Sequence, residues 1–300
     1  MTEFKEFSCP LGSHSTIPRE LLHDKSLDFK RVFTERDQIA KLSVKLQEIH
    51  QSGFTTLPTC CTLEIEALGG ILEIPADVVG PKVIGFAYAN EEDINRLIYK
   101  TEFTLRQKEN FAAIRLLHEQ GKKVCFNIAG PLTVLNGLME LGLVFRILRR
   151  QKKSLEAFFQ YYRASLMKIV EEAKKQGADI ISYGDPICAV SIVGPKVYQE
   201  IMESFVVPFL RNWNVDNLPL HLCPKTSLGL IKAGYATTES YQFTGDLTYS
   251  EALLLANDVD KTIFGQRCLN SDRKTKIQNV FALILNEENI EATDGRKRGI

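Results

Sequence analysis

The feature that most constrains this chain is a repeated alternation of short β-rich runs with long amphipathic stretches, which begins after Gly53. A helix between two strands of one sheet brings the chain back to the starting edge, so consecutive strands run parallel. The alternation therefore predicts an α/β protein with a parallel sheet. The β-rich runs occupy residues 55–64, 82–88, 123–130, 178–185, 218–223, 235–243 and 261–269.

The helical stretches have apolar residues at helical spacing, at residues 91–103, 155–177 and 196–213. Gly177 closes the second stretch, where a helix commonly ends in a left-handed residue. Strands that each end in polar or reactive residues are typical of a (β/α)8 TIM barrel, whose active site lies at the carboxyl ends of the strands. We therefore expect a TIM barrel. An open doubly wound sheet is the alternative, although no GxGxxG turn follows the first strand.

The pattern contains seven strand runs, whereas a complete barrel has eight. The barrel is thus either short of one βα unit or contains a strand that the pattern does not reveal. Residues 27–52 have helical periodicity, and no linker rich in Pro, Gly and Ser interrupts the chain. We expect an N-terminal helical extension over 1–53 and a TIM-barrel domain over 54–300, together forming one structural domain.

Composition excludes several classes of function. Lys plus Arg and Asp plus Glu both number 37, so the net charge is zero and gives no general attraction to nucleic acid. No apolar run approaches the roughly 18 residues of a membrane span, and the first residues do not resemble a signal peptide. Seven scattered cysteines indicate free thiols in a reducing cytoplasm. The sequence leaves open whether the chain forms a homo-oligomer.

The segment PLHLCPK carries two metal-ligand types, His221 and Cys223. In a strand, residues i and i+2 face the same side, so an imidazole and a thiolate could reach one zinc ion. Pro224 ends the strand and places the pair at the carboxyl end. Cys268, at the end of another run, is the candidate third ligand, which would leave one position open for a thiol or water. The alternative is a core histidine beside cysteines that act as small hydrophobic residues.

Four segments in order resemble the uroporphyrinogen decarboxylase superfamily, in its methylcobamide-dependent methyltransferase branch. They are TTLPTCCTLEIEALGG (55–70), NIAGPLTVLNGLM (127–139), GADIISYGDP (177–186) and HLCPKTSLGLIKAGY (221–235). The resemblance covers about residues 54–240 and lies in the order and spacing of the segments. It implies a (β/α)8 barrel with zinc held by His221, Cys223 and a later Cys, for which Cys268 is the candidate.

The resemblance also implies an activity: a zinc-dependent methyltransferase that moves a methyl group between methylcobamide, carried on a separate corrinoid protein, and a thiol or methyl-donor substrate. The chain departs from the patterns of the superfamily in three ways. The 45-residue separation of Cys223 and Cys268 is short, Pro224 stands where Gly is common, and the Arg-rich N-terminal motif of true decarboxylases is absent. The alternatives are a decarboxylase-like lyase and a non-catalytic corrinoid- or tetrapyrrole-binding paralogue.

Further candidate residues follow the predicted strands. Glu64, Glu66 and Asp185 are candidate catalytic residues because carboxylates at strand ends handle protons or contact substrate. The glutamates could instead complement a helix dipole, and Asp185 could cap a helix or turn. Asn127 and Tyr183 are candidate cofactor-binding residues, with packing as the alternative for the tyrosine.

Overall fold

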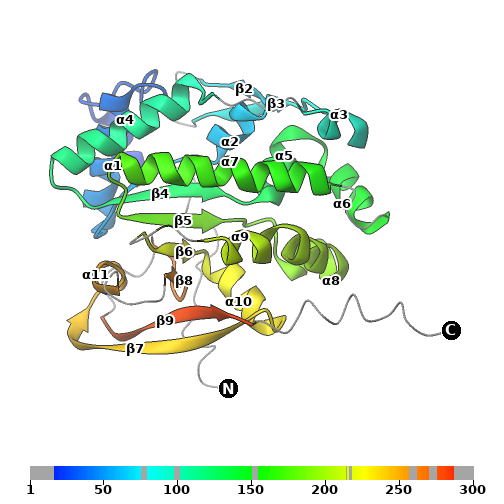
Figure 1. Ribbon diagram of the computed structural model, residues 1–300. Coiled ribbons are helices and arrows are strands. Elements are labelled where there is room, and N and C mark those ends of the chain that lie inside the picture. Colours follow the sequence, from blue (N-terminus) through cyan, green and yellow to red (C-terminus); the bar gives the residue numbers. More distant parts are fainter. Residues whose placement is uncertain are drawn as a thin grey trace.

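The main sheet is mostly parallel and has the strand order β1-β4-β5-β6-β8-β9-β7 in the described residues. The computed structural model describes residues 17–75, 80–97, 102–150, 155–213, 215, 218–256, 262–269 and 276–286. The arrowheads of β4 and β5 point the same way in Figure 1. The parallel strands are β1 (Thr55–Leu57), β4 (Val124–Ala129), β5 (Ile180–Gly184), β6 (Leu220–Leu222) and β8 (Ile263–Phe264).

Two antiparallel strands complete this sheet. β9 (Ile277–Leu285) pairs with β8 on one side and with β7 (Ala236–Leu247) on the other. Within the described part of the chain, β1 and β7 are therefore the edges of the sheet. The α/β class and the mostly parallel sheet of a TIM-barrel-like fold are confirmed. Five parallel strands are described, so the departure from eight is larger than the single missing unit that the sequence suggested.

Two of the predicted strands lie elsewhere than expected. The run at 82–88 contains β3 (Lys82–Gly85), which pairs antiparallel with β2 (Ile71–Glu73) in a separate two-stranded sheet. Its alternate residues are exposed, whereas strands of a parallel sheet are buried on both faces. The run at 235–243 overlaps β7, which pairs antiparallel with β9. Most residues of β7 remain accessible at the sheet edge, whereas a strand of a parallel sheet would be buried on both faces.

Helices occupy the connections between strands, as the alternation predicted. Figure 1 shows the long α7 running alongside β4 and β5. The α-helices are α1 (Arg36–His50), α2 (Thr62–Ala67), α3 (Glu91–Asn95), α4 (Leu105–Glu119), α5 (Pro131–Leu138), α6 (Leu141–Arg150), α7 (Glu156–Lys175), α8 (Val190–Ile201), α9 (Val207–Arg211), α10 (Pro224–Lys232) and α11 (Tyr249–Leu255); η2 (Arg19–His23) is a 3-10 turn, and η3 (Met202–Val206) is a π-helical turn.

The helix ends follow local chemistry. Gly177, with φ of 102°, takes the left-handed conformation that the sequence predicted after α7. The first long helix ends at His50, earlier than the predicted residue 52, because Gln51 takes the left-handed conformation two residues before Gly53. The helix expected between 196 and 213 is present as the contiguous elements α8, η3 and α9, which end at Arg211, and its hydrogen bonding becomes π-helical over η3.

The two faces of the sheet bury different groups. Val124, Phe126 and Ile181 belong to the main core, together with buried residues of α4 and α7. Cys125 and Ile180 belong to a second cluster with residues of α11. Strand alternation sends neighbouring side chains to opposite faces, so the second cluster marks the face that a complete barrel would enclose.

The N-terminal extension is described from residue 17 onwards, and residues 1–16 and 287–300 lie outside the described residues. α1 packs against α4 and β1, and its Ile39 and Ala40 belong to the main core. A boundary at residue 53 stays a prediction. No helix in the described residues combines the length and apolar character needed to cross a membrane.

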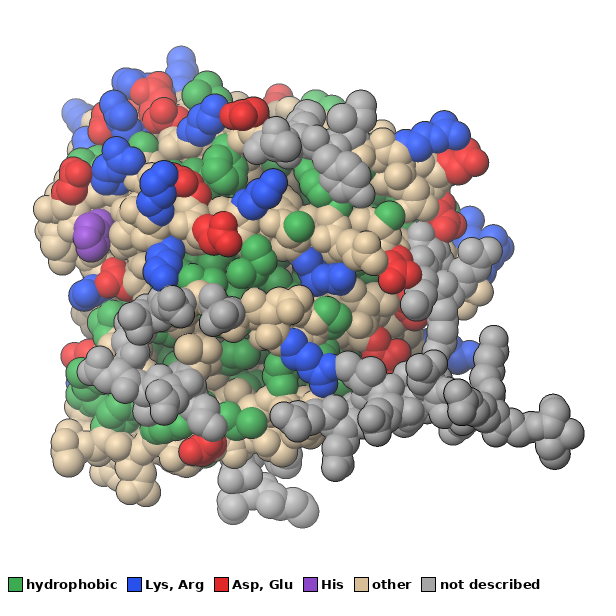
Figure 2. Space-filling view, viewed as in Figure 1, with side chains coloured by type: hydrophobic (Ala, Val, Ile, Leu, Met, Phe, Trp, Pro, Cys, Tyr) green, Lys and Arg blue, Asp and Glu red, His purple; other side chains and the backbone are tan. Residues whose placement is uncertain are grey.

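The charged surface carries both signs side by side. Figure 2 shows Lys and Arg interspersed with Asp and Glu over the face that α4 and α7 cover. This mixture agrees with the zero net charge of the chain. On this face of the molecule there is no extended basic surface of the kind that binds nucleic acid.

Candidate functional site

The predicted site residues gather at the carboxyl ends of the parallel strands. Asn127 lies on β4 and Tyr183 on β5, Asp185 directly follows β5, and the sequence His221-Leu222-Cys223 ends β6. Adjacent parallel strands place these ends at one edge of the sheet, where barrel enzymes build their active sites. The sequence predicted this placement, and the strand bounds confirm it.

A polar row crosses the face that a complete barrel would enclose. In the parallel register Asn127 pairs with Ser182, and Ser182 pairs with His221, so their side chains lie on the same face. The Asn127 Nδ2 donates to the Pro58 carbonyl oxygen at 3.0 Å, which ties the row to the loop after β1. Sequence reasoning missed Ser182, although alternation within its strand would have placed it on this face.

His221 is buried and fully hydrogen-bonded. Its Nδ1 lies 3.2 Å from the Ser182 hydroxyl, and its Nε2 lies 2.8 Å from the Arg267 carbonyl oxygen. The ring of Tyr249, on α11, meets it edge-on at 5.9 Å between centroids. Burial lowers the pKa of His221 to about 4, so the imidazole is neutral at pH 7.

Cys223 and Cys268 are half-buried and lie on different segments. Cys223 is the residue before α10, and its backbone N–H donates to the Tyr183 carbonyl oxygen at 2.9 Å. Cys268 directly follows Arg267, whose carbonyl oxygen contacts His221. Among the described residues, no group of three or more His, Cys, Asp or Glu side chains is arranged to hold a metal ion. With both nitrogens of His221 bonded to protein atoms, this donor set does not fit zinc in the conformation seen.

Glu64 is a buried carboxyl group with one unused oxygen. It lies on α2, 3% exposed, and its Oε1 accepts the Ala129 backbone N–H at 3.0 Å. Its Oε2 has no hydrogen-bond partner in the described residues. Burial raises the pKa of Glu64 to about 7, against an opposing effect of the Ala129 hydrogen bond. A carboxyl group that titrates near neutral pH is suited to accept or donate a proton.

Asp185 organises the turn between β4 and α5. Its Oδ2 accepts the Leu132 N–H at 3.0 Å, and its Oδ1 accepts the Thr133 N–H and hydroxyl at 2.9 and 2.7 Å. A carboxylate here satisfies donors that the first turn of a helix leaves free. Burial raises its pKa to about 6. Asp185 therefore caps the first turn of α5, which is the helix-capping alternative, and a catalytic role for it is a separate proposal.

The same turn requires glycine at position 130. A Cβ there would lie 2.3 Å from the Asp185 Cβ and 2.5 Å from the Tyr183 hydroxyl. Tyr183 is fully buried, and its ring stacks on Phe209 of α9 with 5.8 Å between centroids. Its hydroxyl is also buried and has no hydrogen-bond partner in the described residues.

Glu66 is held by a buried arginine that sequence reasoning missed. Arg106 is 4% exposed, and its NH1 lies 2.8 Å from Glu66 Oε2. The guanidinium also donates to the Thr62 hydroxyl at 3.1 Å and to the Phe33 carbonyl at 3.2 Å. A buried charge needs such partners. No sequence signal distinguished this arginine from the exposed cations of an amphipathic helix.

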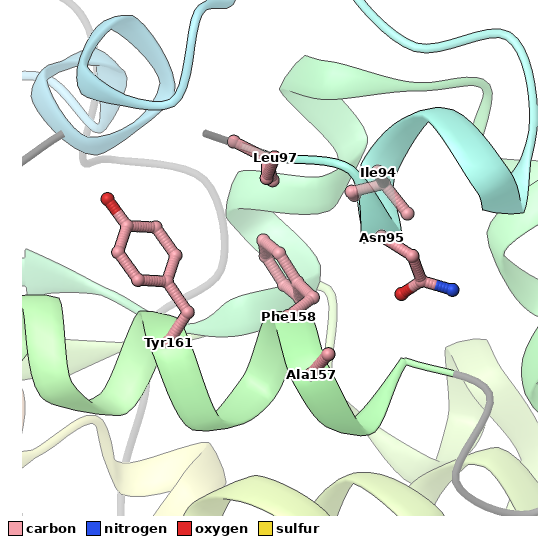
Figure 3. A pocket seen from close by; sticks show the side chains of 6 residues that line it. All are labelled: Ile94, Asn95, Leu97, Ala157, Phe158 and Tyr161. Atoms are coloured by element: carbon pink, nitrogen blue, oxygen red, sulfur yellow. The ribbon is translucent and has the colours of Figure 1, made fainter. Parts of the chain in front are cut away.

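Two small pockets lie outside the polar row. One, between α3 and α7, is lined by Ile94, Asn95, Leu97, Ala157, Phe158 and Tyr161 (Figure 3). In this view the Phe158 and Tyr161 rings rise from α7, with Phe158 between Tyr161 and the α3 residues Ile94 and Asn95. The lining of this pocket contains no acid, thiol or imidazole. The second pocket lies beside the loop after β1, where Cys60 and Arg106 line it. Neither pocket is lined by a residue of the polar row.

Comparisons with known proteins show a matching family and similar proteins. The family model described as uroporphyrinogen decarboxylase (URO-D) matches residues 11–231. The methylcobamide:CoM methyltransferase MtaA of Methanosarcina barkeri is 19% identical over 211 residues, which is 69% of this chain and 62% of that protein; its counterpart from strain Fusaro / DSM 804 is also 19% identical, over 213 residues. The chain thus spans less than two thirds of the length of these curated relatives.

A solved structure supports the same fold. A methyltransferase from Methanosarcina mazei superposes with a TM-score of 0.60 and 21% identity, covering 73% of this chain and 67% of that chain. At this identity, the similarity establishes the fold and leaves the activity to be argued from the site.

Proposed function

The chain belongs to the uroporphyrinogen decarboxylase family, and from this premise we propose that it transfers a methyl group between a corrinoid protein and a small thiol or methyl-donor substrate. The observation that carries the proposal is the similarity to methylcobamide:CoM methyltransferases over 69% of the chain. The carboxyl-end location of the buried acids supports it, because barrel enzymes act at that face.

In the thiol direction, the proton must leave sulfur before the thiolate attacks the methyl carbon. The new S–C bond then forms while the C–Co bond breaks, and its electron pair stays on the cobalt of the corrinoid substrate. We assign the proton to Glu64, whose Oε2 is unpartnered in the described residues and whose pKa of about 7 suits the transfer.

The remaining candidate residues have supporting roles in this proposal. Asp185 holds the β4–α5 turn against which the substrate would lie, and Glu66 fixes Arg106 beside the β1 loop. Asn127 would contact the cofactor or substrate from the polar row, and Tyr183 would do so through its hydroxyl alone. Because the set His221, Cys223 and Cys268 does not fit zinc as folded, no step is assigned to a metal. A cytoplasmic location is also proposed, supported by the six described cysteines, which are all free thiols.

The experiment is a transfer assay with methylcobalamin and a small thiol, followed by visible absorbance and by mass spectrometry of the thioether. We expect loss of methylcobalamin that depends on both protein and thiol, and a kcat at least 10-fold lower in Glu64→Gln. Glu200→Gln is the matched control, because Glu200 is a buried glutamate on α8. Absence of any thioether from the wild-type protein over a range of thiols contradicts the proposal.

A second candidate function is non-catalytic binding of a corrinoid or tetrapyrrole. The hydrogen bonds that occupy both nitrogens of His221 favour it, because they leave the branch's metal chemistry without its imidazole. Binding of hydroxocobalamin, measured by absorbance titration, without any methyl transfer in the assay above would select this candidate.

A further inference from the structure

His221 is central to the buried part of the sheet. It is the middle residue of β6, and both of its neighbours on that strand are also buried. The side chain reaches the Ser182 hydroxyl on β5 on one side and the carbonyl oxygen of Arg267 on the other. Arg267 comes shortly after β8, the next parallel strand. The imidazole therefore spans from one neighbouring strand to the segment that follows the other.

The partners determine which nitrogen carries the proton. A carbonyl oxygen only accepts, so at 2.8 Å the Nε2 must donate. The Nδ1 is then unprotonated and accepts the Ser182 hydroxyl. A zinc ligand needs a free lone pair directed at the metal. In this tautomer one lone pair is used by Ser182, and the other nitrogen carries hydrogen.

A second aromatic residue holds the same segment. The Tyr249 hydroxyl accepts the backbone N–H of Gln266 at 3.0 Å, and its ring packs edge-on against His221. Gln266 is fully buried, and its side-chain oxygen accepts the Phe281 N–H of β9 at 3.3 Å. Residues 266–267 are thus fixed by His221, Tyr249 and β9 together. Cys268, the predicted third ligand, directly follows this fixed segment.

We infer that His221 is a structural bridge between β5 and the segment after β8, held as the Nε2–H tautomer, and that this chain does not bind zinc through it. The chain departs here from the ligand set that the resemblance implied. The inference concerns the imidazole alone, so it stands or falls independently of methyl transfer.

The tautomer can be read directly by NMR of protein labelled with 15N-histidine. We expect the His221 signals to show a protonated Nε2 and an unprotonated Nδ1, unchanged by added zinc or by a chelator. The spectrum of His221→Gln identifies these signals by their loss. A His221 Nε2 without its proton, or a ring signal that shifts on zinc addition and returns with chelator, overturns the inference.

Zinc content and thermal stability give a second readout. Glutamine can donate from its amide nitrogen but is not a usual zinc ligand. We expect zinc below about 0.1 per chain in wild type, His221→Gln and Cys223→Ser alike. The thermal unfolding midpoint of His221→Ala should fall at least twice as far below wild type as that of His221→Gln. The midpoint of Ser182→Ala should be lower than that of wild type by about 2 °C. About one zinc per chain that disappears in both His221→Gln and Cys223→Ser refutes the inference; zinc retained in both places the metal elsewhere and supports it.

Discussion

Replacing Glu64 by glutamine should make the stability of this protein less sensitive to pH. The folded pKa of Glu64 is raised from 4.5 to about 7 because the group is buried. The folded state therefore holds this proton more tightly than the unfolded chain does. The stabilisation is present below pH 4.5 and is lost as the pH rises through 7. Glutamine, which resembles the protonated acid, does not undergo this loss.

The magnitude follows from the shift. About 2.5 pKa units at 1.36 kcal/mol per unit give a total loss of about 3 kcal/mol for the wild type. Roughly 1.4 kcal/mol of this stabilisation is already lost at pH 5.5, because Glu64 is mostly ionised in the unfolded chain at that pH. The free energy of unfolding of Glu64→Gln, relative to wild type, should therefore increase by about 2 kcal/mol between pH 5.5 and 8.5.

Urea unfolding at several pH values measures this difference. Trp213 is the chain's single tryptophan and is buried, so its fluorescence reports loss of packing around α9. Glu200→Gln controls for the removal of one negative charge. If the curves of wild type and Glu64→Gln against pH are parallel, Glu64 does not carry a raised pKa and the proton assignment fails.

Three further changes test the turn after β4. Asp185→Asn should lower the free energy of unfolding by about 2 kcal/mol, measured by urea, because one of its accepting oxygens becomes an amide that faces backbone donors. Gly130→Ala should lower it by about 3 kcal/mol or abolish soluble expression, since its methyl would meet the Asp185 Cβ; Gly184→Ala, with open space around it, is the control and should behave as wild type. Tyr162→Phe should lose about 1 kcal/mol in the same urea assay with the hydrogen bond from its hydroxyl to the Ala129 carbonyl, and an unchanged midpoint would contradict that bond.

The parallel strands and their carboxyl-end residues could be predicted because the signal is local. Runs 123–130, 178–185 and 218–223 contain β4, β5 and β6, and each is a short apolar run followed by a turn or helix start. β9 was missed, because an apolar run alone does not distinguish a buried strand from a helix. β9 pairs antiparallel with both of its neighbours, β8 and β7, so this end of the sheet departs from the predicted parallel order.

The strand-end positions of the candidate residues could be predicted, but their contacts could not. Strand spacing correctly placed Glu64 and Asp185 near the carboxyl ends. Their partners, at residues 129 and 132–133, are more than 50 positions away in the sequence, so their burial could not be read locally. The spacing of His221 and Cys223 suggested a metal. The acceptor of the Nε2 hydrogen bond is a backbone carbonyl oxygen, which has no signature in the sequence.

The strand order also dictates when the last part of the molecule can form during translation. β1, β4, β5, β6 and β8 join the sheet in the order of their synthesis, so each can add to a finished neighbour as it leaves the ribosome. β7 cannot, because its partner β9 is made about 40 residues later. At roughly 10 residues per second, β7 waits about 4 s for its partner, and an unpaired strand of this kind is a site where chaperones can bind or aggregation can begin.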